Sequence, residues 1–197
     1  MSVKVIQVKC PKCNAPIVMK QKDKLFLCNQ CNTLHTRDDG VEVIPFEIAE
    51  FHPNIHGDDV YIPFWKMNAT FEIRYKRSEG GLISKLASFV KGNSNTGNIV
   101  IYIPATDLDT ATFRRLVSLF LSNPPRYSTR FNFGGVRNMP STVTRREAAE
   151  LADFAVVTME ADQPGVLQAL DYSLKINDSK IVYLPFVVTP GGLNPAL

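Results

Sequence analysis

The chain has 197 residues, a length that suits one domain of ordinary size together with a small module. Its 45% hydrophobic and 21% charged residues are typical of a globular protein and exclude a disordered or fibrous one. The longest apolar run, residues 181–188, is too short to span a membrane. The first residues lack the apolar stretch of a signal peptide, so we expect a soluble protein of the reducing cytoplasm.

The formal net charge of +3 is unevenly distributed along the chain. Residues 1–37 hold seven Lys and Arg residues and one acid, whereas residues 38–60 hold seven acids and neither Lys nor Arg. Residues 110–146 then carry seven arginines without any lysine or acid. This asymmetry indicates a modular organisation and is compatible with an anionic partner.

All four cysteines belong to two Cys-x-x-Cys pairs, Cys10-Pro-Lys-Cys13 and Cys28-Asn-Gln-Cys31. The two-residue gap lets both sulfurs of one turn face the same ion, and a spacer of 14 residues allows two short strands to bring the pairs together. Four thiolates can then surround Zn²⁺ as a tetrahedron. A redox pair would need a single motif beside a βαβ pattern, and a disulfide framework an oxidising compartment, so both are disfavoured.

The segment CPKCNAPIVMKQKDKLFLCNQCNTLH resembles a zinc ribbon, a likeness that covers about the first 40 residues. The resemblance implies a structural zinc ion bound by Cys10, Cys13, Cys28 and Cys31, with strand arms at 17–19 and 25–27. Asn14 and Asn32 stand where zinc ribbons commonly have glycine, and asparagine tolerates positive φ better than most residues. A shell of four thiolates is complete, so we expect the zinc to fold the module and not to catalyse.

Residues 41–60 are expected to form an acidic linker or a short connecting strand. His52 and His56 could in principle bind a second metal, but Pro53 and Gly57 indicate a loop, and exposed histidines are the favoured interpretation. His35 is likewise expected at the surface.

From residue 61 onward the pattern predicts an α+β domain with an antiparallel sheet, over residues 61–189, followed by a flexible tail at 190–197. Strict alternation predicts a long strand over 61–75. Helices are predicted over Thr110–Leu121, capped by Asp107 or Asp109, and from Thr144, where Glu147 completes a capping box. Further strands are predicted at 98–103, 154–159, 167–176 and 180–188, the last two joined by a hairpin turn at 177–179.

A short pattern recurs as Tyr61-Ile-Pro-Phe64, Tyr102-Ile-Pro-Ala105 and Tyr183-Leu-Pro-Phe186. Each proline lacks the N–H that a ladder hydrogen bond needs, which predicts a strand end or edge at each copy. The recurrence fits either an internal duplication or chance among β-prone residues.

Two surfaces outside the cysteine motifs are candidates for binding. The first is a partner-docking helix, whose apolar stripe consists of Leu82, Ile83, Leu86, Phe89 and Val90, although packing on its own sheet is favoured. The second is a surface for nucleic acid or another anionic partner, formed by Lys12, Arg126, Tyr127, Arg130, Phe131, Arg137, Arg145 and Arg146. A solvated loop whose aromatic residues fill the core explains the second pattern equally well.

Motifs of nucleotide-binding and hydrolytic enzymes are missing from the sequence, since it contains no P-loop, GxGxxG or GxSxG. The favoured hypothesis is therefore a non-catalytic, zinc-binding adaptor that binds an unidentified protein. The alternative is a protein that binds RNA or single-stranded nucleic acid through the lysines of the ribbon and the arginine-rich surface. An enzyme with a carboxylate-based pocket in the second domain is the least favoured hypothesis.

Overall fold

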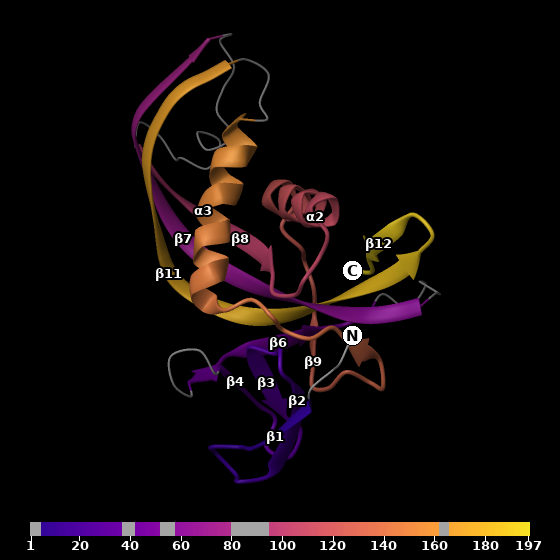
Figure 1. Cartoon of the computed structure of the whole chain (residues 1–197). Helices are drawn as coiled ribbons and strands as arrows, with labels where there is room; N and C mark the ends of the chain where they lie inside the picture. Colours follow the sequence, from indigo (N-terminus) through magenta and orange to yellow (C-terminus); the bar gives the residue numbers. More distant parts are fainter. Residues whose placement is uncertain (1–4, 37–41, 52–57, 80–94, 162–165) are drawn as a thin grey trace.

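The computed structural model describes residues 5–36, 42–51, 58–79, 95–161 and 166–197. Over these residues the protein is α+β, as predicted, with the N-terminal module at one end and a large curved sheet at the other (Figure 1). The predicted docking helix and the histidines at 52 and 56 lie outside the described residues. In the part of the chain that is described, no helix has the length and apolar character needed to cross a bilayer.

Two small antiparallel sheets form the N-terminal module. In one sheet β1 (Val5–Lys9) pairs with β2 (Pro16–Lys20), and in the other β3 (Leu25–Cys28), β4 (Thr33–Thr36) and β5 (Val43–Ile44) are neighbours. The predicted arms are therefore strands, but they pair with other strands and not with each other. As a result each Cys-x-x-Cys motif forms the turn of its own hairpin, between β1 and β2 or between β3 and β4.

The residues expected to connect the two parts form strands, which was the second of the two interpretations. Only Pro45 separates β5, which belongs to the N-terminal module, from β6 (Phe46–Ala49), which belongs to the large sheet. β6 pairs in parallel with β11 (Val166–Thr189) and antiparallel with the short strand β9 (Thr129–Arg130). These residues form strands and not a solvated linker because Ile44, Ile48 and Ala49 are buried in hydrophobic clusters, although the segment is acidic.

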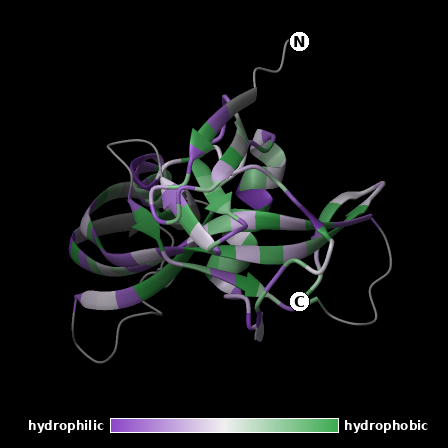
Figure 2. Ribbon diagram, turned by 90° about the horizontal axis from the view of Figure 1, so that it is seen from below, coloured by the Kyte–Doolittle hydropathy of each residue, from purple (hydrophilic) through white to green (hydrophobic). Residues whose placement is uncertain are grey.

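The large sheet is built on two long antiparallel strands, β7 (Asp58–Glu79) and β11, which curve together through its whole length (Figure 1). β8 (Thr96–Pro104) pairs antiparallel with β7, and β10 (Arg137–Asn138) pairs in parallel with the start of β7. The predicted alternation is confirmed, since Trp65, Met67, Ala69 and Phe71 are buried. Figure 2 shows hydrophobic and hydrophilic residues in alternating bands along these strands.

The hairpin turn predicted at residues 177–179 does not exist, because β11 runs through it without interruption. Its polar side chains bond across to β7 instead: Asn177 Nδ2 donates to Thr70 Oγ1 at 2.9 Å, and Asp178 Oδ1 accepts from Asn68 Nδ2 at 2.7 Å. A shift in register between Ile176 and Asp178 accommodates the run as a bulge.

Two helices occur among the described residues, α2 (Thr110–Ser122) and α3 (Arg145–Ala161). Asp109 caps α2, as predicted, by accepting a hydrogen bond from the backbone N–H of Thr112 at 2.9 Å. The predicted capping box is also confirmed, because the N–H of Thr144 donates to Glu147 Oε2 at 2.8 Å and the N–H of Glu147 donates to Thr144 Oγ1 at 3.1 Å.

The strand predicted at residues 154–159 is wrong, since these residues continue α3. Ala148, Ala152, Ala155 and Val156 fall on one helical face and are buried against the sheet. Figure 1 shows α3 lying inside the curve of β7, β8 and β11. A short apolar run fits a buried helix as well as a strand, and here the helical spacing of the small alanines decides the outcome.

A hydrophobic core joins the N-terminal module to the sheet. Leu25, Leu34 and Ile44 from the module belong to the same buried cluster as Trp65 and the alanines of α3. A second cluster centres on Phe64, whose ring stacks on Phe186 and meets Phe120 edge-on, with centroids 5.9 and 5.3 Å away. The module is therefore packed on the sheet and is not merely tethered to it.

The two Tyr-x-Pro segments of β7 and β11 lie opposite each other about a local two-fold axis, so that Tyr61 pairs with Pro185 and Pro63 with Tyr183. Each proline lies inside its long strand, and not at its end. Pro63 falls between the residues that pair with β10 and those that pair with β8, and Pro185 falls between those that pair with β6 and β12. Each proline therefore stands where its strand changes neighbours and needs no N–H donor on that side.

The expected flexible tail contains a further strand, β12 (Gly192–Pro195), which pairs antiparallel with residues 186–189 of β11. Its side chains help to close the core, because Ala196 is fully buried and Leu193 and Leu197 pack against the cluster around Phe64.

We predict that the protein loses stability at alkaline pH through its tyrosines. Burial is the main cause of a raised pKa at five of the six tyrosines, and it raises the pKa of Tyr183 to about 12; the five are Tyr61, Tyr102, Tyr127, Tyr172 and Tyr183. The unfolded chain releases these protons near pH 10, whereas the folded chain keeps them. The contribution of these tyrosines to the free energy of unfolding is therefore complete below about pH 10 and is lost as the pH rises above it.

An alkaline titration followed by tyrosinate absorbance and circular dichroism tests this prediction. We expect most of the absorbance change to accompany the loss of the folded signal. A complete phenolate absorbance change, with secondary structure intact, would contradict it.

Candidate metal centre and adjoining cleft

The four cysteines come together at the turns of the two N-terminal hairpins. All four sulfur atoms lie within 4.8 Å of one another, with 3.7 Å between the Sγ atoms of Cys10 and Cys31 and 3.5 Å between those of Cys13 and Cys28. A tetrahedral zinc ion with Zn–S bonds of about 2.3 Å requires sulfur atoms about 3.8 Å apart. The four sulfur atoms therefore lie close enough together to hold one zinc ion, as the sequence predicts.

The backbone of both turns adopts the conformation that zinc-binding turns need. Asn14 and Asn32 have φ values of 61° and 48°, which confirms that asparagine occupies the left-handed region at both positions. The N–H of Lys12 lies 3.4 Å from Cys10 Sγ, as a donor to the sulfur, while Asn14 N donates to Cys10 O at 2.8 Å. Backbone donors of this kind stabilise a thiolate before any metal binds.

The thiols influence one another strongly. Burial raises the pKa of Cys10, but hydrogen bonds from the backbone of Cys13 and Lys12 outweigh it and lower this pKa to about 6. A backbone hydrogen bond at Ala15 lowers the pKa of Cys13, but burial and the neighbouring thiols raise it to about 12. Four like charges cannot share so small a space unless a cation balances them, and Zn²⁺ supplies that charge.

Substitutions at Asn14 should show whether zinc affinity depends on the backbone conformation at this position or on the asparagine side chain. Asn14→Gly should bind zinc as tightly as the native chain, because glycine adopts positive φ without strain. Asn14→Ala should cost about 1 kcal/mol and weaken zinc binding several-fold, because folding and metal binding are coupled. Competition with a chromophoric chelator measures both affinities. Equal loss in both variants would mean that the asparagine side chain itself matters.

His35 lies beside the cysteine cluster and not at the surface, so the sequence-based expectation is wrong. The side chain is completely buried, its ring stacks on Phe26, and its Nε2 atom lies 3.5 Å from Cys10 Sγ. Its place follows from the register of the short strand β4, in which His35 pairs with Phe26 of β3 across the sheet. A strand of four residues gave too weak a pattern to reveal this from the sequence.

The connection between β2 and β3, residues 21–24, is called the tip of the N-terminal module here. A large cleft opens between this tip and the two helices, and we call it the tip–helix cleft. It has a volume of about 900 Å³ and a mainly apolar lining that includes Leu108, Phe113, Val143, Leu151 and Phe154. Charged side chains of both signs complete its walls: Lys22, Lys24, Arg114, Asp107, Glu147 and Glu150.

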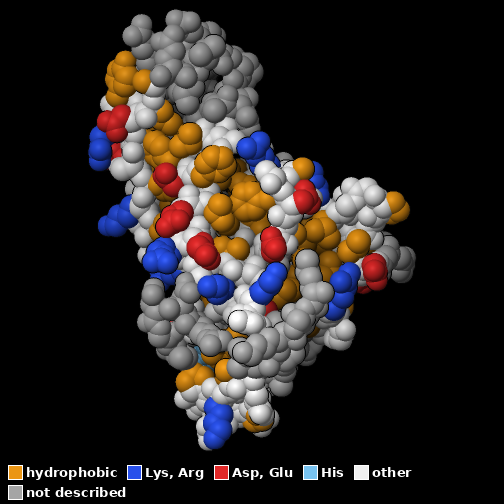
Figure 3. Space-filling model, viewed as in Figure 1, with side chains coloured by type: hydrophobic (Ala, Val, Ile, Leu, Met, Phe, Trp, Pro, Cys, Tyr) orange, Lys and Arg blue, Asp and Glu red, His pale blue; other side chains and the backbone are white. Residues whose placement is uncertain are grey.

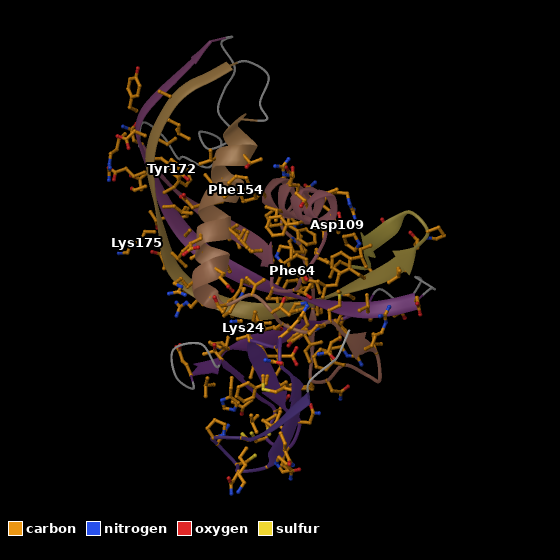
Figure 4. The ribbon with its side chains drawn as sticks, in the orientation of Figure 1. Lys24, Phe64, Asp109, Phe154, Tyr172 and Lys175 are labelled. Atoms are coloured by element: carbon orange, nitrogen blue, oxygen red, sulfur yellow. The ribbon has the colours of Figure 1, made fainter. Side chains whose placement is uncertain are left out.

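The figures show how this cleft is framed. In Figure 4 Phe154 projects from α3, and Lys24 lies at the tip of the module below it. Figure 3 shows hydrophobic side chains gathered over the helices, with acidic and basic groups around them. A smaller cavity of about 70 Å³ between α2 and α3 shares Phe113, Arg114 and Phe154 with the cleft and extends the apolar surface.

The residues predicted to bind nucleic acid lie in three separate places. Lys12 belongs to the first cysteine turn, where its Nζ donates to Thr33 Oγ1 at 3.3 Å, and Arg145 and Arg146 are exposed in the first turn of α3. The remaining residues, from Arg126 to Arg137, lie on the segment around β9 and β10.

Within the segment around β9 and β10 the side chains have different environments. Phe131 is 95% exposed, and Arg126 is exposed as well. The guanidinium group of Arg130 lies against Gly134, where an added Cβ would come within 2.3 Å of its Nη2 atom. Arg137 is 3.8 Å from Asp58, and both side chains are largely exposed. Phe131 and Arg126 are therefore exposed, whereas Arg130 and Arg137 already contact neighbouring residues.

Sequence reasoning missed a polar network on the large sheet. Glu47 accepts hydrogen bonds from Lys180 and from the hydroxyl of Tyr127, and Lys66 Nζ is 3.4 Å from the same hydroxyl as a donor. Lys66 also lies over the rings of Tyr102 and Tyr127, at 5.7 and 5.4 Å from their centroids. This network occupies Tyr127, so its hydroxyl is tied to the sheet and not presented to a ligand.

Comparisons with known proteins do not assign the chain to a group. No protein-family model, no curated protein and no solved structure matches it.

Proposed function

We propose that the protein is a non-catalytic, zinc-stabilised interaction protein, whose N-terminal module is a zinc ribbon and whose tip–helix cleft binds a segment of a partner protein. One observation carries the proposal: Lys22 and Lys24 at the tip of the module line the same cleft as Phe113 and Phe154 of the helices. Binding of zinc in a reducing compartment then shapes one wall of the binding surface, although the metal lies outside the cleft.

The lining of the cleft favours a polypeptide over other ligands. Its apolar floor suits buried aliphatic or aromatic anchors, which supply most of the binding energy in protein interfaces. Asp107, Glu147 and Glu150 would repel the phosphates of a nucleic acid, and a lipid chain has no groups that complement the charges of both signs in the walls. A polypeptide segment with apolar anchors and flanking charges of both signs complements both the apolar floor and the charged walls of the cleft.

Photocrosslinking tests this proposal. A benzophenone analogue of phenylalanine placed at Phe154, which is 51% exposed, should form an adduct with one protein in cells. The purified segment identified in that adduct should then bind the isolated protein, and Phe154→Lys should weaken its binding at least about tenfold by removing an apolar anchor and desolvating a charge.

The same analogue at Phe131 serves as the matched control, because that side chain is exposed and does not line the cleft. A partner that crosslinks equally at both positions, or an adduct with lipid or nucleic acid at Phe154, would overturn the proposal. Zinc chelation should also weaken the purified complex, since it removes the wall that carries Lys22 and Lys24.

A second candidate function is binding of RNA or single-stranded DNA. The exposure of Phe131 and of Arg126 on the same segment favours it, because an exposed aromatic ring can stack on a base while an arginine contacts phosphate. This function predicts an affinity for mixed-sequence RNA that falls steeply with salt and falls about tenfold or more in Phe131→Ala. Binding that is absent, or indifferent to salt, would rule it out.

A further inference from the structure

The side chain of His35 lies within hydrogen-bond distance of the sulfur atom of Cys10, and it does so from a fixed position. Its strand β4 is held between β3 and β5, where His35 pairs with Phe26 on one side and Val43 on the other. The ring stacks on Phe26 with centroids 5.3 Å apart and an interplanar angle of 27°. No part of the side chain reaches solvent, so the contact between its Nε2 atom and Cys10 Sγ at 3.5 Å is built into the core of the module.

His35 is not a fifth ligand. Among the described residues, the potential metal ligands that lie close to one another are the four cysteine sulfurs, and His35 Nε2 is not one of this set. A tetrahedral zinc ion is also fully coordinated by four thiolates. Any effect of His35 on a bound metal must therefore pass through the sulfur of Cys10.

We infer that His35 is a positioning residue of the metal centre, which donates an Nε2–H hydrogen bond to the thiolate of Cys10. This inference rests on the zinc site of the proposed function and adds the residue that holds and tunes one ligand. A thiolate can only accept, so a ring nitrogen at hydrogen-bond distance from it must carry the proton. His35 therefore adds a side-chain donor to the backbone N–H of Lys12 at the sulfur of Cys10.

The other ring nitrogen supports the same tautomer. His35 Nδ1 is buried and has no hydrogen-bond partner among the described residues. A proton on Nδ1 would leave a buried donor unpaired and would also turn the lone pair of Nε2 toward a negatively charged sulfur. A proton on Nε2 avoids both costs, because it pairs the donor and leaves only an acceptor unsatisfied.

The hydrogen bond should matter for metal affinity. Residues that bond to metal ligands fix their orientation and adjust their charge, and their loss typically weakens metal binding about 10- to 100-fold. His35 combines this contact with a ring that fills space beside Phe26, so substitution must separate the donor from the packing.

Three variants of the full chain make this separation. His35→Phe removes the donor and keeps an aromatic ring, His35→Gln keeps an N–H at a similar reach, and Phe26→Leu removes the stacking partner while leaving the donor. Zinc affinity is measured at one pH by competition with a chromophoric chelator. We expect a loss of about 10- to 100-fold in His35→Phe, and a loss several times smaller in the other two variants.

Spectroscopy of the native chain gives an independent readout. With an NMR-active cadmium isotope in place of zinc, scalar coupling between the metal and the Nε2 proton of His35, relayed through Cys10 Sγ, is expected. This measurement stands even if a variant fails to fold. A ring protonated at Nδ1, or zinc affinity unchanged in a folded His35→Phe variant, would overturn the inference while leaving the metal site intact. A native chain that binds no zinc would overturn the proposed metal site as well.

Discussion

Replacing Cys28 by serine is expected to unfold the N-terminal module and abolish zinc binding. Cys28 is 1% exposed and belongs to a small buried cluster with Cys10, Ile17, Met19 and Phe26. So few apolar side chains cannot hold two short sheets together without the metal, whose binding supplies folding free energy on the order of 10 kcal/mol in structural sites. Zinc content should fall from one ion per chain to none, and proton–nitrogen correlation spectra should lose the dispersed amide signals of residues 5–36.

Strong chelation of the native chain should reproduce the spectrum of Cys28→Ser, and Lys22→Ser at the tip should leave both zinc content and dispersion unchanged. Because Leu25 and Leu34 belong to the core of the large sheet, the rest of the protein should also become less stable. A Cys28→Ser chain that keeps a folded module would show that the cysteines do not form a structural metal site.

Replacing Phe64 by alanine is expected to cost about 3–5 kcal/mol of unfolding free energy. Phe64 is completely buried at the centre of the second cluster, between Phe120 of α2 and Phe186 of β11 (Figure 4). Its removal leaves a cavity bordered by two long strands and a helix, none of which can move inward without disturbing its own hydrogen bonds. Urea denaturation followed by circular dichroism measures the difference.

The same substitution at Phe131 is the matched control, because this ring is 95% exposed and contributes little to the core. Phe131→Ala should change the unfolding free energy by no more than about 0.5 kcal/mol. A cost below about 1 kcal/mol at Phe64 would mean that the aromatic cluster repacks around the vacancy, against the usual behaviour of close-packed cores.

Those parts of the structure that follow from local chemistry could be predicted from the sequence. The spacing of the cysteines predicted the cluster of four thiols, Asp109 and Thr144 marked the helix starts, and strict alternation revealed β7. In each case a few neighbouring residues determine the conformation, so distant parts of the chain add little information.

Other parts depend on contacts between distant residues. Asn177 and Asp178 carry the composition of a turn, yet hydrogen bonds to Thr70 and Asn68 keep them in a strand. The sequence at Phe154 fits the start of a strand, but the residues form a helix because the alanines around Phe154 pack on the sheet as one helical stripe. The tip–helix cleft could not be predicted for the same reason, since Lys22 and Phe113 line one cleft only when the module is packed on the sheet.

The pairing of β7 with β11 also has a consequence for the order of folding during synthesis. Residue 58 pairs with residue 188, and residue 79 with residue 166, so the central ladder closes only when the end of the chain is available. Until then β7 can pair, among the described strands, with β8 and the short β10, and the edge that faces β11 remains an open template for wrong pairing. Long-range pairing of this kind is slow, so a nascent or C-terminally shortened chain is the form of this protein most prone to aggregate.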